Sequence, residues 1–255
     1  MDRSQLKIES RKAFLFGANG NLGRFWIAAL RDLEYLILGY GVEGKFQFEE
    51  EFSNLKYEYL DLNLAPEDLI VEKLEKEKPY AIVYNSGIDS RPGSGKSEIS
   101  KYSVQEWNDI FSVNLLGAVK VLNAVGNCKN PPKRVVVIGS MYSTKSPNPL
   151  LYAHYGESGQ IKHPAYAASK AALLSTVKQF ASIYIARDIY VNMISPGAIY
   201  SNQDEEFKSK ISSRIPANRL GQGIELIPSL KFLLEDSNRF VVGQNLIVDG
   251  GMNLW

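Results

Sequence analysis

The sequence is poor in the residues that build disulfides and metal sites. It contains one cysteine, Cys128, and two histidines, His154 and His163, among 255 residues. A single cysteine excludes an internal disulfide, and we expect Cys128 to be a structural thiol in a reducing compartment, which favours a cytoplasmic location. No cluster of cysteine, histidine or carboxylate has the spacing of a metal site, and we therefore predict no metal.

The sequence also lacks a charge imbalance and a long apolar run. Lysine and arginine number 29 against 28 aspartate and glutamate, which gives a formal net charge of +1. This balance gives no reason to expect nucleic acid as a partner. No run approaches the roughly 20 consecutive apolar residues that cross a bilayer, and the charged residues 1–10 do not resemble a secretory signal. We therefore expect no membrane partner.

The sequence does contain a regular alternation of short apolar runs with amphipathic helical segments. Helical periodicity is strongest at 104–125 and 165–187, with a shorter segment at 225–234. The strand-like runs lie at residues 13–16, 35–38, 57–60, 80–84, 135–138, 190–194 and 245–248. Strands that alternate with helices form parallel sheets covered on both faces. We predict an α/β fold: a single Rossmann-type doubly wound domain over residues 1–255, with a seven-stranded parallel sheet and helices on both faces.

Tyr166 and Lys170 lie four residues apart near the start of a predicted helix, so their side chains should leave the same face. A free tyrosine keeps its proton until about pH 10, and a nearby ammonium group favours the phenolate. The pair can therefore exchange protons with a substrate. The spacing alone is common on solvated helix faces, so its weight depends on the rest of the chain.

Glycine recurs at every third position of a segment between the first predicted strand and the first helix, at Gly17, Gly20 and Gly23. Such a turn lets a pyrophosphate approach the backbone N–H groups at the start of a helix. An ordinary glycine turn is the competing interpretation.

Further motifs follow in a compatible order: Asp61-Leu62, Asn85-Ser86-Gly87, Asn114, Ser140, Pro196-Gly197 and a tail at 242–251. Together with the glycine turn and the Tyr166/Lys170 pair, they resemble the short-chain dehydrogenase/reductase family over essentially the whole chain. The resemblance implies four catalytic residues, with tyrosine as general acid and base: Asn114, Ser140, Tyr166 and Lys170. It implies cofactor contacts from Gly17, Asn19, Gly20, Asn21, Leu22, Gly23, Asp61, Leu62, Asn85, Ser86, Gly87, Tyr166, Lys170, Pro196, Gly197, Ile199 and Ser201.

The cofactor implied by this resemblance is NAD or NADP. In the family, an acid at the end of the second strand normally binds the adenosine ribose, but this segment reads Leu38-Gly-Tyr-Gly41. Glu43 is the nearest acid, whereas Arg24 and Lys45 are candidates for binding a phosphate. The sequence does not decide between the two cofactors.

Two loops, at 141–164 and 201–220, are expected to shape the substrate pocket. The first is longer than the family pattern, and its polar and aromatic groups suit a polyhydroxylated ligand, although they could equally pack the loop onto the domain: Tyr142, Asn148, Tyr152, His154 and Tyr155. Segments 140–143, 147–152, 164–170 and 194–203 are similar to bacterial flagellin-modification reductases of nonulosonate and sugar pathways. That narrower resemblance implies a sugar-derived substrate, with Asn202 and Gln203 as candidate contacts.

We therefore expect an NAD(P)-dependent oxidoreductase that interconverts a secondary alcohol and a ketone on a small polar, sugar-derived substrate. Three alternatives stay open. A 3-oxoacyl-carrier-type reductase belongs to the same family, the glycine spacing is also typical of an epimerase or dehydratase, and the missing ribose acid is compatible with a non-catalytic dinucleotide sensor. The resemblance also implies a homotetramer or homodimer that pairs through residues 106–125 and 166–187.

Overall fold

The protein is described by a computed structural model for residues 11–42, 52–89, 102–152 and 162–254. Seven strands form one parallel sheet in the order β3-β2-β1-β4-β5-β6-β7. The strands are β1 (Lys12–Phe16), β2 (Leu36–Gly41), β3 (Leu55–Tyr59), β4 (Ala81–Tyr84), β5 (Arg134–Ile138), β6 (Tyr190–Pro196) and β7 (Asn245–Val248). The order reverses between β1 and β4, and ligands of open α/β sheets bind at such a switch point. The predicted α/β fold with a seven-stranded parallel sheet is confirmed.

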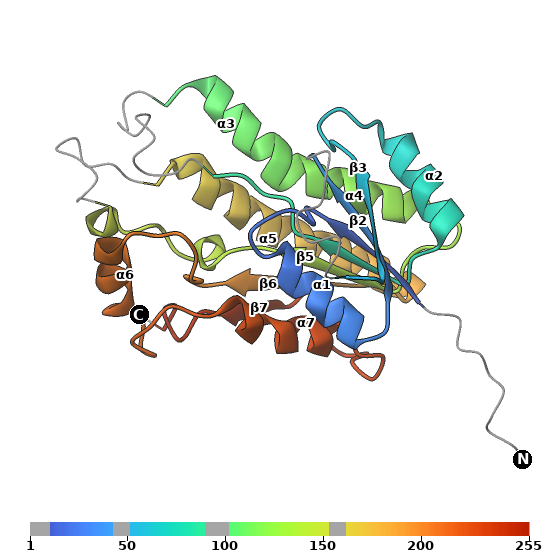
Figure 1. Cartoon of the computed structure of the whole chain (residues 1–255). Coiled ribbons are helices and arrows are strands. Elements are labelled where there is room, and N and C mark those ends of the chain that lie inside the picture. The colour runs from blue at the N-terminus through green and yellow to red at the C-terminus, as the bar shows by residue number, and fades with distance from the viewer. Residues whose placement is uncertain (1–10, 43–51, 90–101, 153–161, 255) are drawn as a thin grey trace, which may run out of the picture.

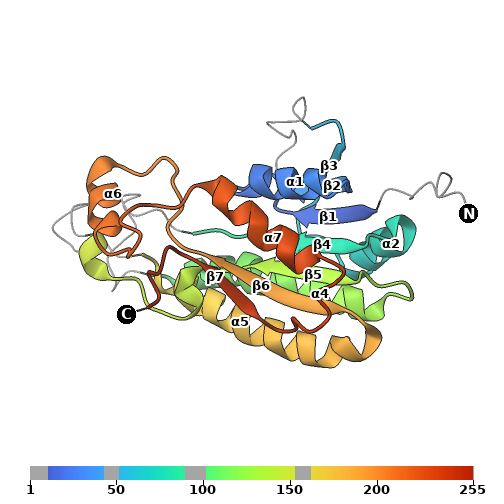
Figure 2. The same cartoon turned by 90° about the horizontal axis from the view of Figure 1, so that it is seen from below.

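Helices cover both faces of this sheet (Figures 1 and 2). Side chains alternate along a strand, so Phe14 and Phe16 join one apolar cluster while Ala13 and Leu15 join the other. The first cluster is covered by α2 (Glu67–Glu77), α4 (Gly117–Asn127) and α5 (Pro164–Tyr184). The second is covered by α1 (Gly23–Asp32) and α7 (Ile227–Leu234).

The helix predicted at 104–125 is interrupted by a π-helical turn. It consists of α3 (Val104–Phe111), the π turn Ser112–Leu116 and then α4. Within the described residues, Val104–Asn127 is the one helix long and apolar enough to pass as a membrane span, yet 44% of its apolar window is buried inside the protein. It also packs against α5 and α2, so we assign it to the protein core. The π turn is a local widening of the kind often found at functional sites.

The helix predicted at 165–187 is α5, followed by the 3₁₀ turn Ile185–Arg187. His163 caps its start, because its Nδ1 accepts a hydrogen bond from the Ala165 N–H at 3.1 Å. Pro164 occupies the first helical position, where the missing N–H has no cost. Tyr166 therefore lies in the first turn of α5 and Lys170 in the second.

The two loops expected to shape the substrate pocket pack against each other. A third apolar cluster joins residues from 141–152 to α6 (Glu205–Ser212) and the segment after it. Tyr142 and Tyr152 are 4% and 3% exposed, and their hydroxyls lie 3.2 Å apart. These two tyrosines thus pack the loop onto the protein, as the alternative interpretation predicted. His154 and Tyr155 lie outside the described residues.

Candidate functional site

The glycine turn after β1 has a geometry that only glycine accommodates. Gly17 has a φ of +77°, and a Cβ there would lie 2.6 Å from the Ser86 backbone nitrogen. At Gly23, a Cβ would lie 1.8 Å from the Ala18 carbonyl oxygen. Within the described part of the chain, no hydrogen bond is assigned to the N–H of Asn21 or Leu22, which precede α1. The turn is therefore compact and offers free donors, as a pyrophosphate requires.

Asn85 holds this turn from the neighbouring strand. Its Nδ2 donates to the Gly17 carbonyl oxygen at 2.8 Å, and its Oδ1 accepts from Trp26 Nε1 at 2.8 Å. Asn85 therefore connects the end of β4 to both the glycine turn and α1. A Cβ at Gly20 would approach the same Asn85 amide to 3.0 Å. The side chain of Asn85 therefore supports the turn from Gly17 to Gly23, which we call the dinucleotide cradle. The backbone of Ser86 lies beside Gly17 of this turn.

The end of β2, where the family's ribose acid is missing, is occupied by a tyrosine hydroxyl from β3. A Cβ at Gly41 would lie 2.6 Å from the Tyr57 hydroxyl, so the tyrosine uses the space that glycine leaves. Asn19 Nδ2 donates to this hydroxyl at 3.0 Å. The sequence did not indicate Tyr57, because nothing in the primary structure places β3 side chains beside Gly41.

The other residues considered for the adenosine end have neighbours of their own. The guanidinium of Arg24 lies 4.6 Å from the Phe25 ring centroid. Glu43 and Lys45 lie outside the described residues. Asp61 accepts a hydrogen bond from the Asn63 N–H at 2.8 Å. Leu62 is buried, and its carbonyl oxygen accepts a hydrogen bond from Lys120.

Asn114 lies in the π turn and is fully buried. Its Oδ1 accepts from the Ile88 N–H at 2.7 Å, and its Nδ2 donates to the Ile88 carbonyl oxygen and to Ser169 Oγ, both at 3.0 Å. The amide therefore connects the segment after β4 to α5, the helix that carries Tyr166 and Lys170. A single amide aligns the two elements that surround the site.

Lys170 is buried at the centre of the site. Its Nζ donates to the Ile138 carbonyl oxygen at 3.1 Å, and burial lowers its pKa to about 8. Gly87 keeps the space beside it open, since a Cβ there would lie 3.3 Å from Lys170 Nζ and 3.5 Å from Asn114 Oδ1. The structure thus brings three predicted motifs together: the Asn-Ser-Gly element, Asn114 and the lysine of α5.

Tyr166 and Ser140, the predicted proton-transfer residues, lie next to each other. Tyr166 is half-buried, and its ring centroid lies 5.9 Å from Lys170 Nζ. Burial raises the pKa of Tyr166, whereas Lys162 and a hydrogen bond with Ser140 lower it. Ser140 follows β5, and its Oγ accepts from the Tyr142 N–H at 3.2 Å. The phenol of Tyr166 therefore has a hydroxyl and an ammonium group as neighbours.

The Pro196-Gly197 turn after β6 is packed tightly against the C-terminal tail. A Cβ at Gly197 would lie 2.6 Å from Asp249 Cα. Ile199 then pairs with Gly221 in an isolated parallel bridge. The Ser201 N–H donates to Gln203 Oε1 at 2.7 Å. Gln203, a candidate substrate contact, therefore also holds the backbone that carries the predicted cofactor residues.

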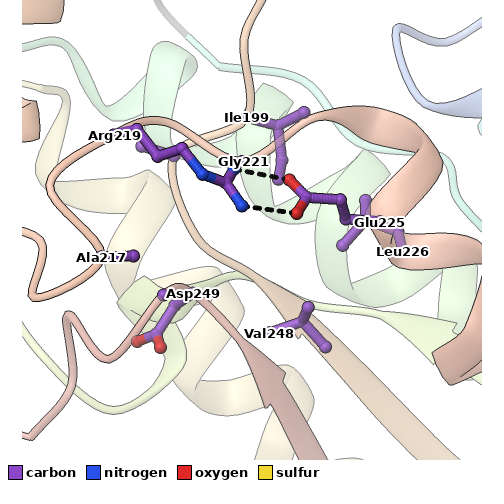
Figure 3. A pocket seen from close by; sticks show the side chains of 10 residues that line it. Ile199, Ala217, Arg219, Gly221, Glu225, Leu226, Val248 and Asp249 are labelled. Atoms are coloured by element: carbon purple, nitrogen blue, oxygen red, sulfur yellow. Dashed lines mark hydrogen bonds and ion pairs between the residues drawn. The ribbon is translucent and has the colours of Figure 1, made fainter.

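A pocket opens beside Ile199, bounded by the bidentate ion pair of Arg219 and Glu225 at 2.7 and 2.6 Å (Figure 3). Val248 and Asp249 line it from the tail. Its lining includes Ile199 but none of the four predicted catalytic residues. The pocket is therefore distinct from the place where the predicted catalytic residues lie.

Comparison with known proteins identifies the family. The sequence model described as enoyl-(acyl carrier protein) reductase matches residues 70–253. The chain belongs to the short-chain dehydrogenase/reductase family. As a member, the protein is an oxidoreductase that acts on a CH–OH group with NAD or NADP as its cofactor.

Alignments with similar proteins extend over almost the whole length of this short-chain dehydrogenase/reductase. The chain is 28% identical over 260 residues to the 3-oxoacyl-(acyl-carrier-protein) reductase FabG of Buchnera aphidicola subsp. Schizaphis graminum, covering 97% of this chain and 99% of that protein. It is 27% identical over 259 residues to FabG of Escherichia coli K12, with the same coverage.

Solved structures share the fold. A short-chain dehydrogenase of Leptospira borgpetersenii with bound NAD⁺ has a TM-score of 0.82 at 21% identity, covering 95% of this chain and 92% of that one. A candidate NAD(P)-dependent gluconate 5-dehydrogenase of Beutenbergia cavernae with bound NADP at low occupancy has a TM-score of 0.80 at 25% identity, covering 96% and 97%.

The sequence motifs of this short-chain dehydrogenase/reductase did not include an ion pair that lies beside Tyr166. Lys162 Nζ is 2.6 Å from Asp89 Oδ2, and their side chains are only 17% and 27% exposed. The same Nζ lies 4.4 Å from the Tyr166 ring centroid. One sequence signal was available: Lys162 precedes Tyr166 by the same four-residue spacing that separates Tyr166 from Lys170.

Proposed function

We propose that the protein interconverts a secondary alcohol and a ketone, with Tyr166 as the general acid and base. One observation carries this proposal: Lys170 Nζ and Asn114 Oδ1 flank the open face of Gly87, at 3.3 and 3.5 Å from where a Cβ would stand. Tyr166 lies one turn before Lys170 in α5, with its ring centroid 5.9 Å from Lys170 Nζ. This arrangement supports a proton-transfer site beside the predicted dinucleotide cradle.

Each residue has a role that its chemistry supports. Tyr166 would donate its hydroxyl proton to the oxygen of a ketone, or accept the proton of an alcohol. Ser140 would donate a hydrogen bond to the same oxygen. Lys170 would stabilise the phenolate left on Tyr166. When bound, the nicotinamide cofactor supplies or accepts the hydride at the carbon.

The side chain of Asn114 makes most of its hydrogen bonds within the protein. Both hydrogens of its Nδ2 and one acceptor position of its Oδ1 are used by Ile88 and Ser169. We propose that Asn114 positions α5 against the segment after β4. Its remaining lone pair is available to a water molecule or to Lys170.

The residues proposed to hold the dinucleotide remain those predicted from the sequence. The turn from Gly17 to Gly23 would take the pyrophosphate, because its glycines permit close approach of backbone donors. Asp61 and Leu62 would contact the adenine end. The segment from Pro196 to Ser201 would hold the nicotinamide end.

For the substrate, we favour a small polar and sugar-derived molecule, as the similarity to flagellin-modification reductases implies. The charged pair of Lys162 and Asp89 beside Tyr166 supports a polar ligand. The second candidate is a 3-oxoacyl thioester, which the similarity to FabG proteins favours. The apolar cluster that packs against Tyr166, with Met141 and Leu151 among its members, is compatible with an acyl chain.

The first test is a titration of the purified protein with NADH and NADPH. Binding is measured by nicotinamide fluorescence and by the rise in thermal stability. With the preferred cofactor, sugar-derived ketones and a 3-oxoacyl thioester would then be compared by consumption of the reduced cofactor. Turnover of one class and not the other selects the substrate. Product without net cofactor consumption would identify an epimerase or dehydratase, and cofactor binding without any turnover a sensor.

We also propose one domain over residues 1–255, a cytoplasmic location and a homotetramer or homodimer. The single sheet containing all seven strands supports the first. Leu116 and Ile183, within the two segments predicted to pair, are 55% and 54% exposed, which supports an apolar pairing surface. Sedimentation at micromolar concentration tests the assembly, and a monomer would contradict it.

A further inference from the structure

Lys162 is a second cation beside the tyrosine of the site and lies outside the family motif. Its Nζ is 4.4 Å from the Tyr166 ring centroid, whereas Lys170 Nζ is 5.9 Å away. The two lysines lie four residues on either side of Tyr166 in the sequence. Tyr166 is therefore approached by two ammonium groups.

The position of Lys162 is fixed by its neighbours. Asp89, in the segment after β4, holds its Nζ at 2.6 Å. The ring of Tyr142 lies 5.2 Å from the same atom. With side-chain exposures of 17% and 27%, the ion pair is shielded from the solvent and salt that weaken surface pairs.

We propose that Lys162, held by Asp89, is a positioning residue that shares with Lys170 the stabilisation of the Tyr166 phenolate and so sets the pH range in which Tyr166 transfers protons. This inference rests on the proposed function of Tyr166. The proton lost from the phenol passes to the substrate oxygen during reduction and returns from the alcohol during oxidation.

The two lysines differ in the pH range over which they keep their charge. Burial lowers the pKa of Lys170 to about 8, so its ammonium group is increasingly lost above that pH. Burial also acts to lower the pKa of Lys162, but Asp89 and Tyr166 outweigh it, and the pKa of Lys162 is raised. Lys162 therefore keeps its charge where Lys170 loses it. An opposite charge within about 4–6 Å is close enough to shift a neighbouring equilibrium.

The environment of Tyr166 contains charges of both signs from several elements. Burial raises its pKa, and Lys162 is the largest influence in the opposite direction. Asp89 and Tyr142 raise it, and the hydrogen bond with Ser140 lowers it. His163 and Lys170 interact electrostatically with Asp89, and Tyr152 interacts with Asp89, Tyr142 and Tyr166. Lys170, on α5, is the second lysine near the Tyr166 ring. Removing the charge of Lys162 therefore leaves Asp89 as an unbalanced anion near the phenol.

The direct test is the titration of Tyr166 in protein labelled with ¹³C at tyrosine Cζ, with Tyr166→Phe used to assign the resonance. We expect Lys162→Met to move the Tyr166 titration to higher pH, and Lys162→Arg to restore it toward the wild-type position. An unchanged titration in a folded Lys162→Met protein would overturn the proposal. If the methionine variant does not fold, Lys162→Gln is measured against the same criterion.

Lys73→Met is the matched control. Lys73 Nζ lies 2.7 Å from Glu58 Oε2 and 5.2 Å from the Tyr40 ring centroid, with a side chain that is 25% exposed. This variant therefore removes a lysine with a carboxylate partner and a tyrosine neighbour at a position outside the site. We expect the titration of Tyr166 to be unchanged, and a shift equal to that of Lys162→Met would contradict a local effect.

Activity separates this inference from the proposed function. Once a ketone that reacts is known, the corresponding alcohol is used as the substrate for oxidation. We expect Lys162→Met to oxidise this alcohol with a kcat/KM about tenfold lower than that of the wild type near pH 7, and we expect kcat/KM to recover as pH rises. Unchanged titration together with normal turnover would remove the role of Lys162 and leave the proposed function intact. A shifted titration in a protein that turns over no ketone or alcohol would do the reverse.

Discussion

Replacing Gly17 with alanine should introduce two kinds of strain at the dinucleotide cradle, one from the backbone conformation and one from a steric clash. The φ of +77° is unfavourable for any residue with a Cβ, by about 1–2 kcal/mol. The new Cβ would also lie 2.6 Å from the Ser86 backbone nitrogen, and overpacking of this kind costs about 1–3 kcal/mol. We therefore expect Gly17→Ala to lower the free energy of unfolding by about 2–5 kcal/mol, a large share of a typical domain's stability.

Gly243→Ala isolates the first of these effects. Gly243 has a similar φ of +66°, but a Cβ there would meet its nearest neighbour, Ala181 Cβ, at 3.3 Å. This variant should lose only about 1 kcal/mol, because the strain of the backbone is partly offset by the lower entropy of the unfolded chain. Both variants would be compared by urea denaturation, and their NADH binding by nicotinamide fluorescence.

The two variants should also differ in cofactor binding. Ser86 presents backbone atoms to Gly17, so relief of the clash must move the segment after β4 or the turn itself. We expect Gly17→Ala to weaken NADH or NADPH binding by at least tenfold, and Gly243→Ala to leave it unchanged. Equal losses of stability in the two variants, with unchanged binding in both, would refute this account of the cradle.

Three further predictions concern residues of the proposed site. Tyr166→Phe should reduce kcat/KM by about 10²–10⁴ while the protein still binds the cofactor, as steady-state rates and fluorescence titration would show. Lys170→Met should be more stable than the wild type by about 1–3 kcal/mol below pH 8 in urea denaturation of the ligand-free protein. The pKa of Lys170 falls from 10.5 to about 8 on folding, so the wild type must bury a charged group below pH 8, and this cost disappears as pH rises toward 10.5. Asn114→Ala should lower the free energy of unfolding by about 2–4 kcal/mol, since it leaves the N–H and C=O of Ile88 without their partner; a loss below 1 kcal/mol would contradict that role.

The sequence was sufficient for the sheet because most of its strands are short apolar runs, with β3 (Leu-Lys-Tyr-Glu-Tyr) the exception. Side chains of parallel strands must be apolar on both faces, and β4 and β5 are buried along their whole lengths. Motifs at the carboxyl ends of those strands were predictable for the same reason, since a parallel sheet brings such ends to one edge. Asn85 and Ser140 are accordingly found where their strands end.

The features that the sequence did not indicate depend on contacts between distant segments. The π turn contains Asn114, whose amide bonds to Ile88 and Ser169, and helical periodicity does not report such a turn. Tyr57 reaches the end of β2 because Gly41 leaves it space, which requires the register of β2 and β3. The tyrosines of the loop at 141–164 had equal polar and packing interpretations until their burial was known.

The charge state of the site depends on burial as much as on the family motif. Burial raises the pKa of Tyr166 and lowers the pKa of Lys170 to about 8, so low polarity opposes the phenolate and the ammonium together. Lys170 alone would therefore lose its charge as the pH approaches the range where Tyr166 could lose its proton. A cation whose own carboxylate partner keeps it charged resolves this conflict, and Lys162 with Asp89 has that property. The lysine of the motif and the lysine before the helix thus act on the same phenol over different ranges of pH.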